Sequence, residues 1–540
     1  MHIRTDIHPL DLAIIVIYLV GILAVGILST RKRRVTGSVF FLAGRSLKWW
    51  IVGAALFASN ISTIHLVGFA ASGYNEGLVW GNFEWMAGFT LVLLALVFAP
   101  FYFKSRISTL PEFLERRYSP ASRSILAFMA IMAALLIHIG MSLYAGAAVF
   151  KRFFGINLVT SIGVVAVITV IYTVVGGLQA VVVTETIQAS ILLLGAIIIT
   201  ISAMLALPAH GIHSWGQLAA AVKPGQLTMI HSHDSAGLTW YAVLLGYPVI
   251  GMWYWCTDQT IVQRVLGAET QQDAQIGPIF TGFLKILPVL LMVFPGVLGY
   301  VMFRNIIGTA SNETLPVLIE QLIPTGLRGV ISAAILAALM STIAAALNSS
   351  GTLVAVDIVK RLKPATTDRA QVWIGRVSSI VVMILATLWS TQGAKFSSIF
   401  AAVNSIAADL APPITAVFLW GVFWRRGTKE ASLVTLITGF LAGAAVFVLD
   451  LPVFGTHKII TERWGIPFMM QAWWLFCFCT LVYFLTSLVT PAPAPEQVEG
   501  LTWEHPVAVI TQAKFSGVGD PRLLAGLLVL TLAILYYLFR

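Results

Sequence analysis

The chain has 540 residues, of which 58% are hydrophobic and only 10% are charged. Its mean hydropathy of +0.89 excludes a soluble globular protein and indicates a polytopic membrane protein. The formal net charge of +10 would suggest a nucleic-acid partner in a soluble chain. Here the Lys and Arg residues fall in short loops between apolar segments, as basic cytoplasmic loops do. We therefore expect a lipid bilayer and no nucleic acid as partners.

Apolar segments follow one another along the whole chain, and each is near the ~20 residues that a helix needs to cross a bilayer. About fourteen membrane-spanning helices are expected, and several are long enough to be tilted or broken. The expected spans are residues 11–29, 47–74, 78–102, 122–149, 157–177, 182–207, 239–264, 274–303, 327–356, 371–391, 397–424, 430–449, 467–489 and 521–539.

Basic residues assign the expected loops to the two sides of the membrane. The run Arg31–Arg34 directly follows the first span and indicates a cytoplasmic loop, so the N-terminus is expected outside. The pair Lys151–Arg152 is an exception on the outer side. We expect a multi-pass protein of the cell (inner or plasma) membrane with both termini outside. The other expected cytoplasmic loops are Lys104–Arg117, Gln263–Asp273, Asp357–Arg369 and Arg425–Lys429.

Two expected spans carry polar groups near their middle, where a bilayer normally rejects them. They are Gly53–Tyr74 and Tyr241–Arg264, and each is interrupted by Gly, Asn, Ser, Thr or Asp. Interrupted helices at matching places in two halves of a transporter indicate its binding site. Spans 2–6 and spans 7–11 each hold five helices and each set begins with an interrupted one. Five is odd, so the two sets enter the membrane from opposite sides, as in an inverted repeat.

Several chargeable or strongly polar side chains fall inside these spans. Hydroxyl groups that bond back to the preceding turn explain any single Ser or Thr near residue 60, but not a cluster that also contains Asn60 and His65. Glu84 lies early in the third span and Lys285 about eleven residues into the eighth. Lys285 can reach the membrane edge by its long stem, whereas at mid-depth it should face a polar cavity. An acceptor and a donor together suit a polyhydroxylated solute.

Aromatic and hydroxyl groups add to this pattern. Tyr254 and Trp255 fit a packed core or an interfacial belt, but aromatic rings also pack on the C–H face of a sugar. Ser341 and Thr342 are adjacent hydroxyls in an Ala-rich span. Small residues allow close helix packing, while hard oxygen ligands beside an unwound helix also suit Na⁺. The eleventh span contributes Asn404.

The expected outer loop 208–238 is rich in histidine. A metal site is one interpretation, but no recognised ligand spacing is present. We favour solvated loop histidines. The residues are His210, His213, His231 and His233, with Asp234 beside the last.

Several stretches together resemble the sodium/solute symporter family, and most closely its sodium/glucose cotransporter branch. The similarity runs from about residue 40 to about residue 430, and WYWCTDQ…IVQR is its most specific signal. It implies an all-α membrane protein with a leucine-transporter-type core of five plus five inverted helices, flanking helices and alternating access. The matching stretches are Phe41–Gly73, Phe83–Trp85, Tyr172–Gln188, Trp253–Arg264 and Asn348–Val359.

The resemblance also implies a Na⁺ site and a sugar site, with Tyr254 as the inner gate. For Na⁺ it implies the backbone oxygens of Ala58, Ile61 and Ala338 and the hydroxyls of Ser341 and Thr342. For the sugar it implies Asn60, His65, Glu84, Tyr254, Trp255, Lys285 and Asn404.

Some positions depart from the family pattern. Asn404 stands where the sugar carriers have Gln, and Asp409 stands where no charge is expected. Relatives that bind two Na⁺ carry further hydroxyls and an Asp at positions that are Ala344, Ala345 and Glu185 here. We therefore expect one Na⁺ per substrate.

The expected function is Na⁺-coupled symport of a monosaccharide such as glucose or galactose. The alternatives are myo-inositol, sialic acid, a nucleoside or another small polar solute, or a sugar-responsive sensor or channel on the same fold. An enzyme is not expected, because the chain shows no nucleophile–base pair or metal constellation. The expected organisation is a flanking helix and loop (1–45), a first repeat (46–208), an outer loop (209–238), a second repeat (239–425), flanking helices (426–490), a linker (491–520) and a C-terminal helix (521–540).

Overall fold

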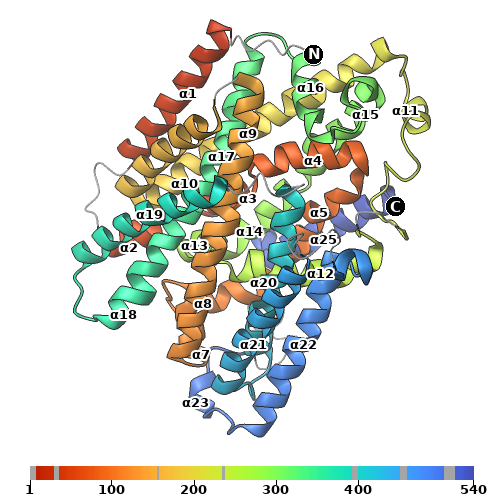
Figure 1. Cartoon of the computed structure of the whole chain (residues 1–540). Helices are drawn as coiled ribbons and strands as arrows, with labels where there is room; N and C mark the ends of the chain where they lie inside the picture. Colours follow the sequence, from red (N-terminus) through yellow and green to blue (C-terminus); the bar gives the residue numbers. More distant parts are fainter. Residues whose placement is uncertain are drawn as a thin grey trace.

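The computed structural model describes residues 8–29, 36–154, 157–233, 237–391, 399–450, 459–503 and 517–540, which form a bundle of helices (Figure 1). The helices of the first half are α1 (Pro9–Leu28), α2 (Gly37–Leu42), α3 (Trp49–Asn60), α4 (Thr63–Asn75), α5 (Asn82–Leu93), α6 (Ala99–Lys104), α7 (Leu110–Arg117), α8 (Pro120–Ala133), α9 (Ser142–Phe154), α10 (Leu158–Ala206) and α11 (Trp215–Ala221). Those of the second half are α12 (Trp240–Met252), α13 (Gln259–Leu266), α14 (Gln271–Leu284), α15 (Phe294–Ile307), α16 (Thr314–Leu322), α17 (Leu327–Thr352), α18 (Lys360–Leu362), α19 (Asp368–Ser390), α20 (Ile399–Phe423), α21 (Lys429–Leu449), α22 (Phe468–Val489), α23 (Pro495–Val498) and α25 (Pro521–Leu538). Wider π-helical turns include η3 (Leu94–Phe98), η4 (Ala134–Met141), η6 (Trp253–Thr257), η7 (Val289–Val293) and η9 (Leu353–Val359).

The all-α membrane fold is confirmed, but fewer helices qualify as membrane spans than the sequence predicts. Among the described residues, 11 helices are long and apolar enough to cross a bilayer, or 12 when the bent pair α3–α4 is taken as one span. The expected number of about fourteen spans is higher than this number of helices for two reasons. The expected spans 157–177 and 182–207 form one continuous element, α10, and the expected span 239–264 is divided between α12 and α13.

The element α10 doubles back on itself. A straight helix of its 49 residues would be more than twice as long as the ~30 Å hydrocarbon core. The backbone turns at Gly177, where φ is +58° and ψ is −152°. Atoms of Tyr172 and Thr184 lie 2.8 and 3.4 Å from the point where a β-carbon on Gly26 would sit. Because both flank the same residue of α1, α10 contains two antiparallel crossings.

Both interrupted spans are broken helices, as the sequence predicts. The helices α3 and α4 meet at 63°, and between them Ile61 and Ser62 have extended backbone, with ψ of 107° and 175°. In the second span, α12 continues through η6, and Asp258 (φ −80°, ψ 122°) separates it from α13. Each break leaves backbone groups outside the regular helical ladder, in the middle of an apolar segment.

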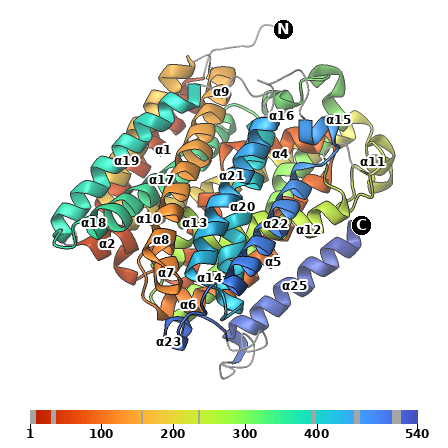
Figure 2. The same ribbon diagram turned by 60° about the horizontal axis from the view of Figure 1, so that its bottom comes forward.

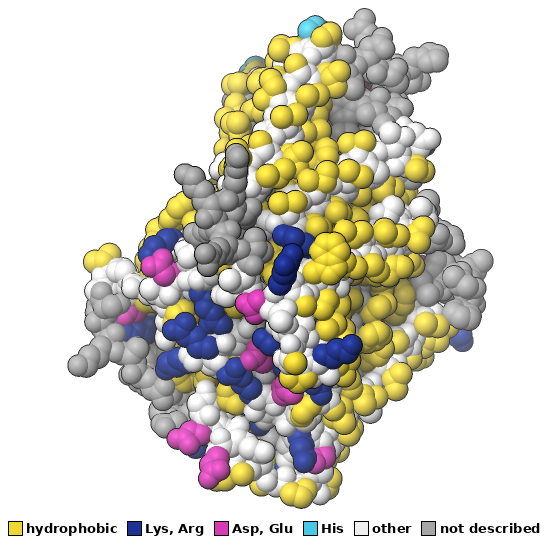
Figure 3. All heavy atoms as spheres, turned by 90° about the vertical axis from the view of Figure 1, so that its left-hand side faces the viewer, with side chains coloured by type: hydrophobic (Ala, Val, Ile, Leu, Met, Phe, Trp, Pro, Cys, Tyr) yellow, Lys and Arg dark blue, Asp and Glu magenta, His cyan; other side chains and the backbone are white. Residues whose placement is uncertain are grey.

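Basic loops gather at one end of the bundle. Arg123 Nε lies 2.7 Å from Asp357 Oδ1, and Arg117 Nη1 donates to the carbonyl of Gly427 at 3.1 Å. These bonds join α8 to η9, and α7 to the loop that follows α20. Figure 3 shows Lys and Arg side chains together in the lower part of one side of the molecule, with hydrophobic side chains above them. We call the end of the bundle formed by residues 104–119, 357–369 and 424–429 the basic face; the run Arg31–Arg34 lies outside the described residues.

Both ends of the described chain lie at the other end of the bundle. Near the start of α1, Asp11 Oδ1 accepts from the backbone N–H of Gly326 at 2.8 Å. Beyond α25, the carbonyl of Phe539 accepts from the N–H of Met229 at 2.7 Å. Lys223, in the same loop as Met229, donates to the carbonyl of Asn75, and the Asn75 amide donates to Ser311 Oγ in the turn before α16. Gly326 follows that short helix. The termini therefore share a side of the membrane, and its assignment as the outer side stays a prediction.

The C-terminal helix α25 packs at the edge of the bundle. Figure 2 shows it beside α14 and α5, with much of its length facing outward. The ring of Tyr536 meets that of Trp85 edge to face, with centroids 5.4 Å apart. This contact ties α25 to α5, one of the helices that line the central pocket described below.

The turn at Gly177 gives a test of the doubled α10. A β-carbon there would lie 2.4 Å from the carbonyl oxygen of Phe40, and the positive φ adds strain of about 1–3 kcal/mol for any other residue. We predict that Gly177→Ala lowers the thermal unfolding midpoint of the purified protein by several degrees. Gly163→Ala is the matched control, because nothing lies within 4 Å of its β-carbon position. Equal thermal unfolding midpoints for Gly177→Ala and Gly163→Ala would contradict a tight turn of the backbone at Gly177.

Candidate functional site

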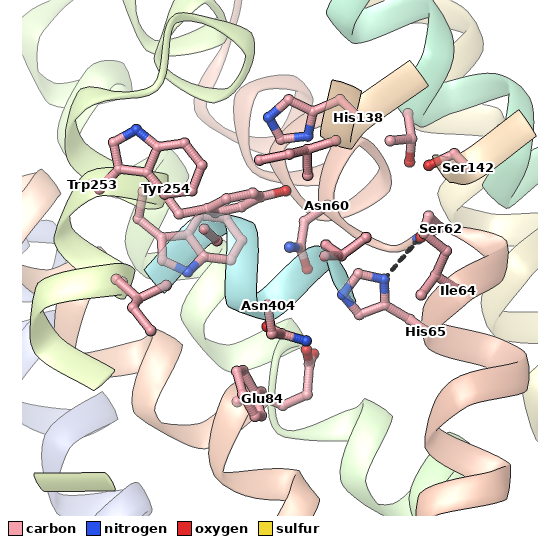
Figure 4. Close-up of a pocket in the computed structure, with 18 of the residues that line it drawn as sticks. Asn60, Ser62, Ile64, His65, Glu84, His138, Ser142, Trp253, Tyr254 and Asn404 are labelled. Atoms are coloured by element: carbon pink, nitrogen blue, oxygen red, sulfur yellow. Dashed lines mark hydrogen bonds between the residues drawn. The ribbon is translucent and has the colours of Figure 1, made fainter. Parts of the chain in front are cut away.

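The two broken helices border one pocket at the centre of the bundle. Its volume is about 110 Å³, below the roughly 300–1,000 Å³ typical of ligand pockets, so the pocket is narrow in this conformation. All seven residues that the sequence suggests for the substrate contribute to its wall, and Figure 4 shows several of them around the shared space: Asn60, His65, Glu84, Tyr254, Trp255, Lys285 and Asn404.

A buried ion pair lies at one side of this pocket. Lys285 Nζ is 2.5 Å from Glu84 Oε2 and also donates to Asn60 Oδ1. Lys285 and Glu84 are only 1% and 2% exposed. Lys285 Nζ also lies 5.3 Å from the ring centroid of Trp255. Lys285 thus faces a polar cavity within the membrane instead of reaching its edge, since transfer of either charge into lipid alone would be costly.

The break between α3 and α4 positions His65. The backbone N–H of Ser62 donates to His65 Nδ1 at 3.2 Å, and Ser62 Oγ lies 3.0 Å from the same nitrogen. In the neutral ring the hydrogen then sits on Nε2. His65 caps the start of α4 while lining the pocket, so one residue serves both the helix break and the site.

The proposed Na⁺ ligands also meet at this break. Ser341 Oγ donates to the carbonyl of Ala58 at 2.8 Å, and Thr342 Oγ1 donates to the carbonyl of Ser59 at 3.2 Å. Both hydroxyls lie near the carbonyl of Ala338 as well, at 3.1 and 3.2 Å. Carbonyl and hydroxyl oxygens at an unwound helix form a suitable donor set for a hard cation such as Na⁺.

Two features of this cluster were not expected. The carbonyl of Ser59 joins the set that the sequence suggests, and Thr63 Oγ1 donates to the carbonyl of Ile335 at 3.2 Å. Hydroxyl contacts with α17 thus occur on both sides of the break. The remaining expected ligand, Ile61, lies in the break itself and is fully buried. The contact of Ser59 is made by its backbone carbonyl, which its side chain does not signal, and the resemblance did not include it.

Glu185 belongs to a second buried ion pair. Its Oε1 lies 2.6 Å from Arg264 Nη2, and Arg264 Nε donates to Oε2 at 3.2 Å. Ser59 Oγ donates to the same carboxylate at 2.9 Å. Both charged side chains are 0% exposed. Glu185 therefore links α3, at the Na⁺ cluster, to α13, which follows the second helix break.

The pocket wall also includes His138, which pairs with Asp258 behind it and was not among the expected site residues. His138, on η4, has Nε2 2.8 Å from Asp258 Oδ2, and both side chains are about 5% exposed. The other oxygen of Asp258 accepts from the N–H of Thr260 at 2.7 Å and caps α13. The rings of His138 and Tyr254 are 5.8 Å apart. A histidine in the middle of the fourth apolar span was the available signal.

Asp409 is buried but does not line the pocket. It is 6% exposed, and its Oδ1 has no hydrogen-bond partner among the described residues. A β-carbon on Gly443 of α21 would lie 2.1 Å from the Asp409 carbonyl oxygen. Asp409 thus lies at the tight packing of α20 on α21, and only Asn404 of the two departures on this helix reaches the pocket.

The loop histidines bond locally. His210 Nδ1 lies 3.1 Å from the carbonyl of Ala206, and His231 Nε2 lies 3.0 Å from the carbonyl of Gly225. Asp234 lies outside the described residues.

Solved structures with similar architecture define the fold. A Na⁺-coupled sialic acid symporter in a substrate-bound outward-open state matches with a TM-score of 0.77 at 23% identity, over 90% of this chain and 100% of that chain. A nucleobase-cation-symport-1 family transporter in a closed conformation matches with a TM-score of 0.53 at 13% identity. The match covers 85% of this chain and 97% of that chain. The fold is thus the leucine-transporter-type fold of Na⁺ symporters.

Sequence comparison narrows the class to a family. The model of the sodium:solute symporter family matches residues 40–439. A sodium/mannose cotransporter from Bos taurus is 35% identical, over 91% of this chain and 89% of the relative. Sodium/myo-inositol cotransporter 2 from Mus musculus is 32% identical, over 94% of this chain and 81% of the relative. Sodium/glucose cotransporter 2 from Rattus norvegicus is 32% identical, over 91% of this chain and 80% of the relative.

The chain therefore belongs to the sodium:solute symporter family. It is a membrane protein that uses Na⁺ to move a small solute, as the sequence predicts, and it is not an enzyme.

The buried pair next to the Na⁺ cluster gives a test. Glu185→Gln leaves the Arg264 charge buried without its partner, which costs about 3–5 kcal/mol. We predict a lower thermal midpoint for Glu185→Gln and for Arg264→Gln, and a partial recovery in the double variant. A double-mutant cycle on thermal unfolding of the purified protein measures the coupling. Strict additivity of the two single losses would show that the pair does not act as a unit.

Proposed function

We propose that this protein is a Na⁺-coupled symporter of a monosaccharide such as glucose or galactose, working by alternating access. The observation that carries the proposal is the double role of Thr342. Its hydroxyl holds the carbonyl of Ser59 at the broken helix, and the same residue lines the polar pocket. An ion bound at the helix break would therefore lie next to the substrate.

The chemistry of the pocket supports a polyhydroxylated solute. Glu84 offers an acceptor, Lys285 a donor, and the amides of Asn60 and Asn404 offer both. Trp255 supplies an aromatic face beside the ammonium group. In the narrow conformation Lys285 donates to both Glu84 and Asn60. A sugar would replace those contacts with its hydroxyls, so the polar groups would stay paired when the pocket widens.

The break at Ile61 and Ser62 supports a role for Na⁺ in this exchange. Ser341 and Thr342 reach across from α17 to the carbonyls at the end of α3. With an ion in place, these oxygens would coordinate Na⁺ together and fix α3 against α17. We infer that this fixed arrangement favours the outward-open state, and that Tyr254, in the wall of the pocket, acts as the inner gate.

The second candidate substrate is myo-inositol. It presents a ring of hydroxyls to the same donors and acceptors, and a myo-inositol cotransporter is among the relatives. Asn404 is the discriminating position, because its short side chain lies in the wall of the pocket. Competition of unlabelled myo-inositol against labelled glucose, galactose and mannose in one uptake assay separates these candidates.

Uptake by the purified protein in proteoliposomes tests the function directly. An imposed inward Na⁺ gradient should drive accumulation of labelled monosaccharide above its external concentration. We also expect a Na⁺ activation curve with a Hill coefficient near one and one charge moved per sugar. Sugar-gated current or a sugar-induced signal without accumulation would favour a channel or sensor, and a charge ratio of two would refute the single Na⁺ site.

The pocket assignment gives a prediction about sugar transport. Glu84→Gln or Lys285→Gln leaves the other member of a buried pair without its charge partner, and we predict a fall in uptake of roughly 100-fold or more. Lys48→Gln and Glu269→Gln are matched controls, because they break a 2.8 Å ion pair that is about half exposed. A Na⁺-dependent thermal shift that persists in the pocket variants shows that they fold. Wild-type uptake in both pocket variants would remove the assigned pocket.

The Na⁺ cluster gives a prediction about ion dependence. Ser341→Ala and Thr342→Val each remove one oxygen ligand, and we predict that the half-activating Na⁺ concentration rises about tenfold. Ser350→Ala is the matched control, since that hydroxyl lies on the same helix and, among the described residues, bonds only within its own helix, to the carbonyl of Ala346 at 2.8 Å. Unchanged Na⁺ activation in both cluster variants would place the ion elsewhere.

A further inference from the structure

A second cavity lies on the basic face, apart from the central pocket. Its volume is about 860 Å³, and its wall comes from α6, from the loop between α20 and α21, and from residues 492–503 after α22. It shares no lining residue with the central pocket. Because α6, α20 and α22 end at this point and α21 begins there, the cavity lies at the boundary of the membrane.

The charge of this cavity is positive. Lys104, Arg425 and Arg426 line it, against one carboxylate, Glu499. Within the described ranges, none of these four side chains lies within ion-pair distance of an opposite charge. The net charge of two positive units is therefore not compensated by described protein groups, and it attracts an anion into the cavity.

Two residues that line the cavity each have a buried N–H donor with no acceptor among the described residues. Trp503 is 8% exposed and its Nε1 is unpaired, although its backbone N–H donates to the carbonyl of Val422 at 2.9 Å. Its ring packs on Phe101, with centroids 4.8 Å apart. Trp503 is thus held firmly, and its indole N–H is left without a partner.

Arg426 is held in the same way. Its Nη2 donates to the carbonyl of Thr490 at 2.9 Å, while its Nη1 is buried and unpaired in the described structure. A buried donor without an acceptor costs about 1–3 kcal/mol, and more for a charged group. Both donors are buried atoms of residues that line the cavity, so a small side-chain shift toward a ligand with acceptor oxygens would give each of them a partner.

We propose that this cavity binds the phosphate group of an anionic phospholipid from the leaflet at the basic face. A phosphate supplies both the negative charge and several acceptor oxygens, and arginine recognises it well. The position at the membrane boundary favours a lipid headgroup as the source, since basic pockets between membrane helices bind such headgroups. A soluble phosphate shares the same chemistry, and the experiment below separates the two sources.

Native mass spectrometry of the purified full-length protein in a neutral detergent tests the site without any transport assay, so its outcome is independent of the proposed sugar symport. The probes are phosphatidylglycerol, phosphatidylcholine and inorganic phosphate. We expect retention of phosphatidylglycerol over phosphatidylcholine. The double variant Lys104→Gln/Arg425→Gln should weaken retention about 30-fold, at roughly fivefold per basic residue. Lys360→Gln/Lys363→Gln is the matched control, because it removes two exposed charges of the basic face outside the cavity.

Trp503→Phe provides a second measurement, since it keeps the ring packing and removes only the N–H. We expect about tenfold weaker retention of phosphatidylglycerol, the scale of one hydrogen bond to a charged group. Competition by millimolar inorganic phosphate would support the phosphate site with a soluble source. Lack of competition would support the lipid source. Equal retention of the two lipids without phosphate binding, or equal behaviour of the cavity and control variants, would overturn the proposal.

Discussion

Two hydroxyl groups on α17 hold the backbone of α3 at the point where that helix ends inside the membrane. A helix that stops in an apolar environment leaves carbonyl groups without partners, and each needs one. Ser341 and Thr342 supply hydrogen bonds to the carbonyls of Ala58 and Ser59. Since the same oxygens form a donor set for Na⁺, the structural solution of the break also provides an ion site. The position of the pocket depends on this arrangement, because Asn60 and His65 flank the break.

The pocket is held together by charges that lipid would reject. Lys285 and Glu84 remain inside the membrane because each offsets the other and Asn60 accepts a further bond. A second buried pair, Glu185 with Arg264, connects the Na⁺ cluster to α13. The first pair joins α5 to the end of α14, and the second joins α10 to α13. Because an unpaired buried charge is costly, the pairs favour a few discrete arrangements over intermediate ones.

Much of this architecture could be predicted from the sequence, and the exceptions have physical reasons. Polar residues inside apolar runs indicated both helix breaks and the residues of the pocket, because a bilayer penalises them strongly. The expected spans 157–177 and 182–207 are present as the two crossings of α10, but the turn between them was not expected, since the single glycine Gly177 with positive φ suffices for it. The carbonyl of Ser59 gave no side-chain signal. The partner of Glu185, Arg264, could not be predicted, because the two lie far apart in the chain.

The most direct test of the account is the thermodynamic linkage between ion and sugar. The affinity of the purified protein for Na⁺ can be measured by calorimetry with and without saturating monosaccharide, and its affinity for the sugar with Na⁺ and with K⁺. If the ion fixes the broken helix beside the pocket, each ligand should tighten the other by the same factor, about 5- to 150-fold. Sugar affinity that is the same in Na⁺ and in K⁺ would contradict the account.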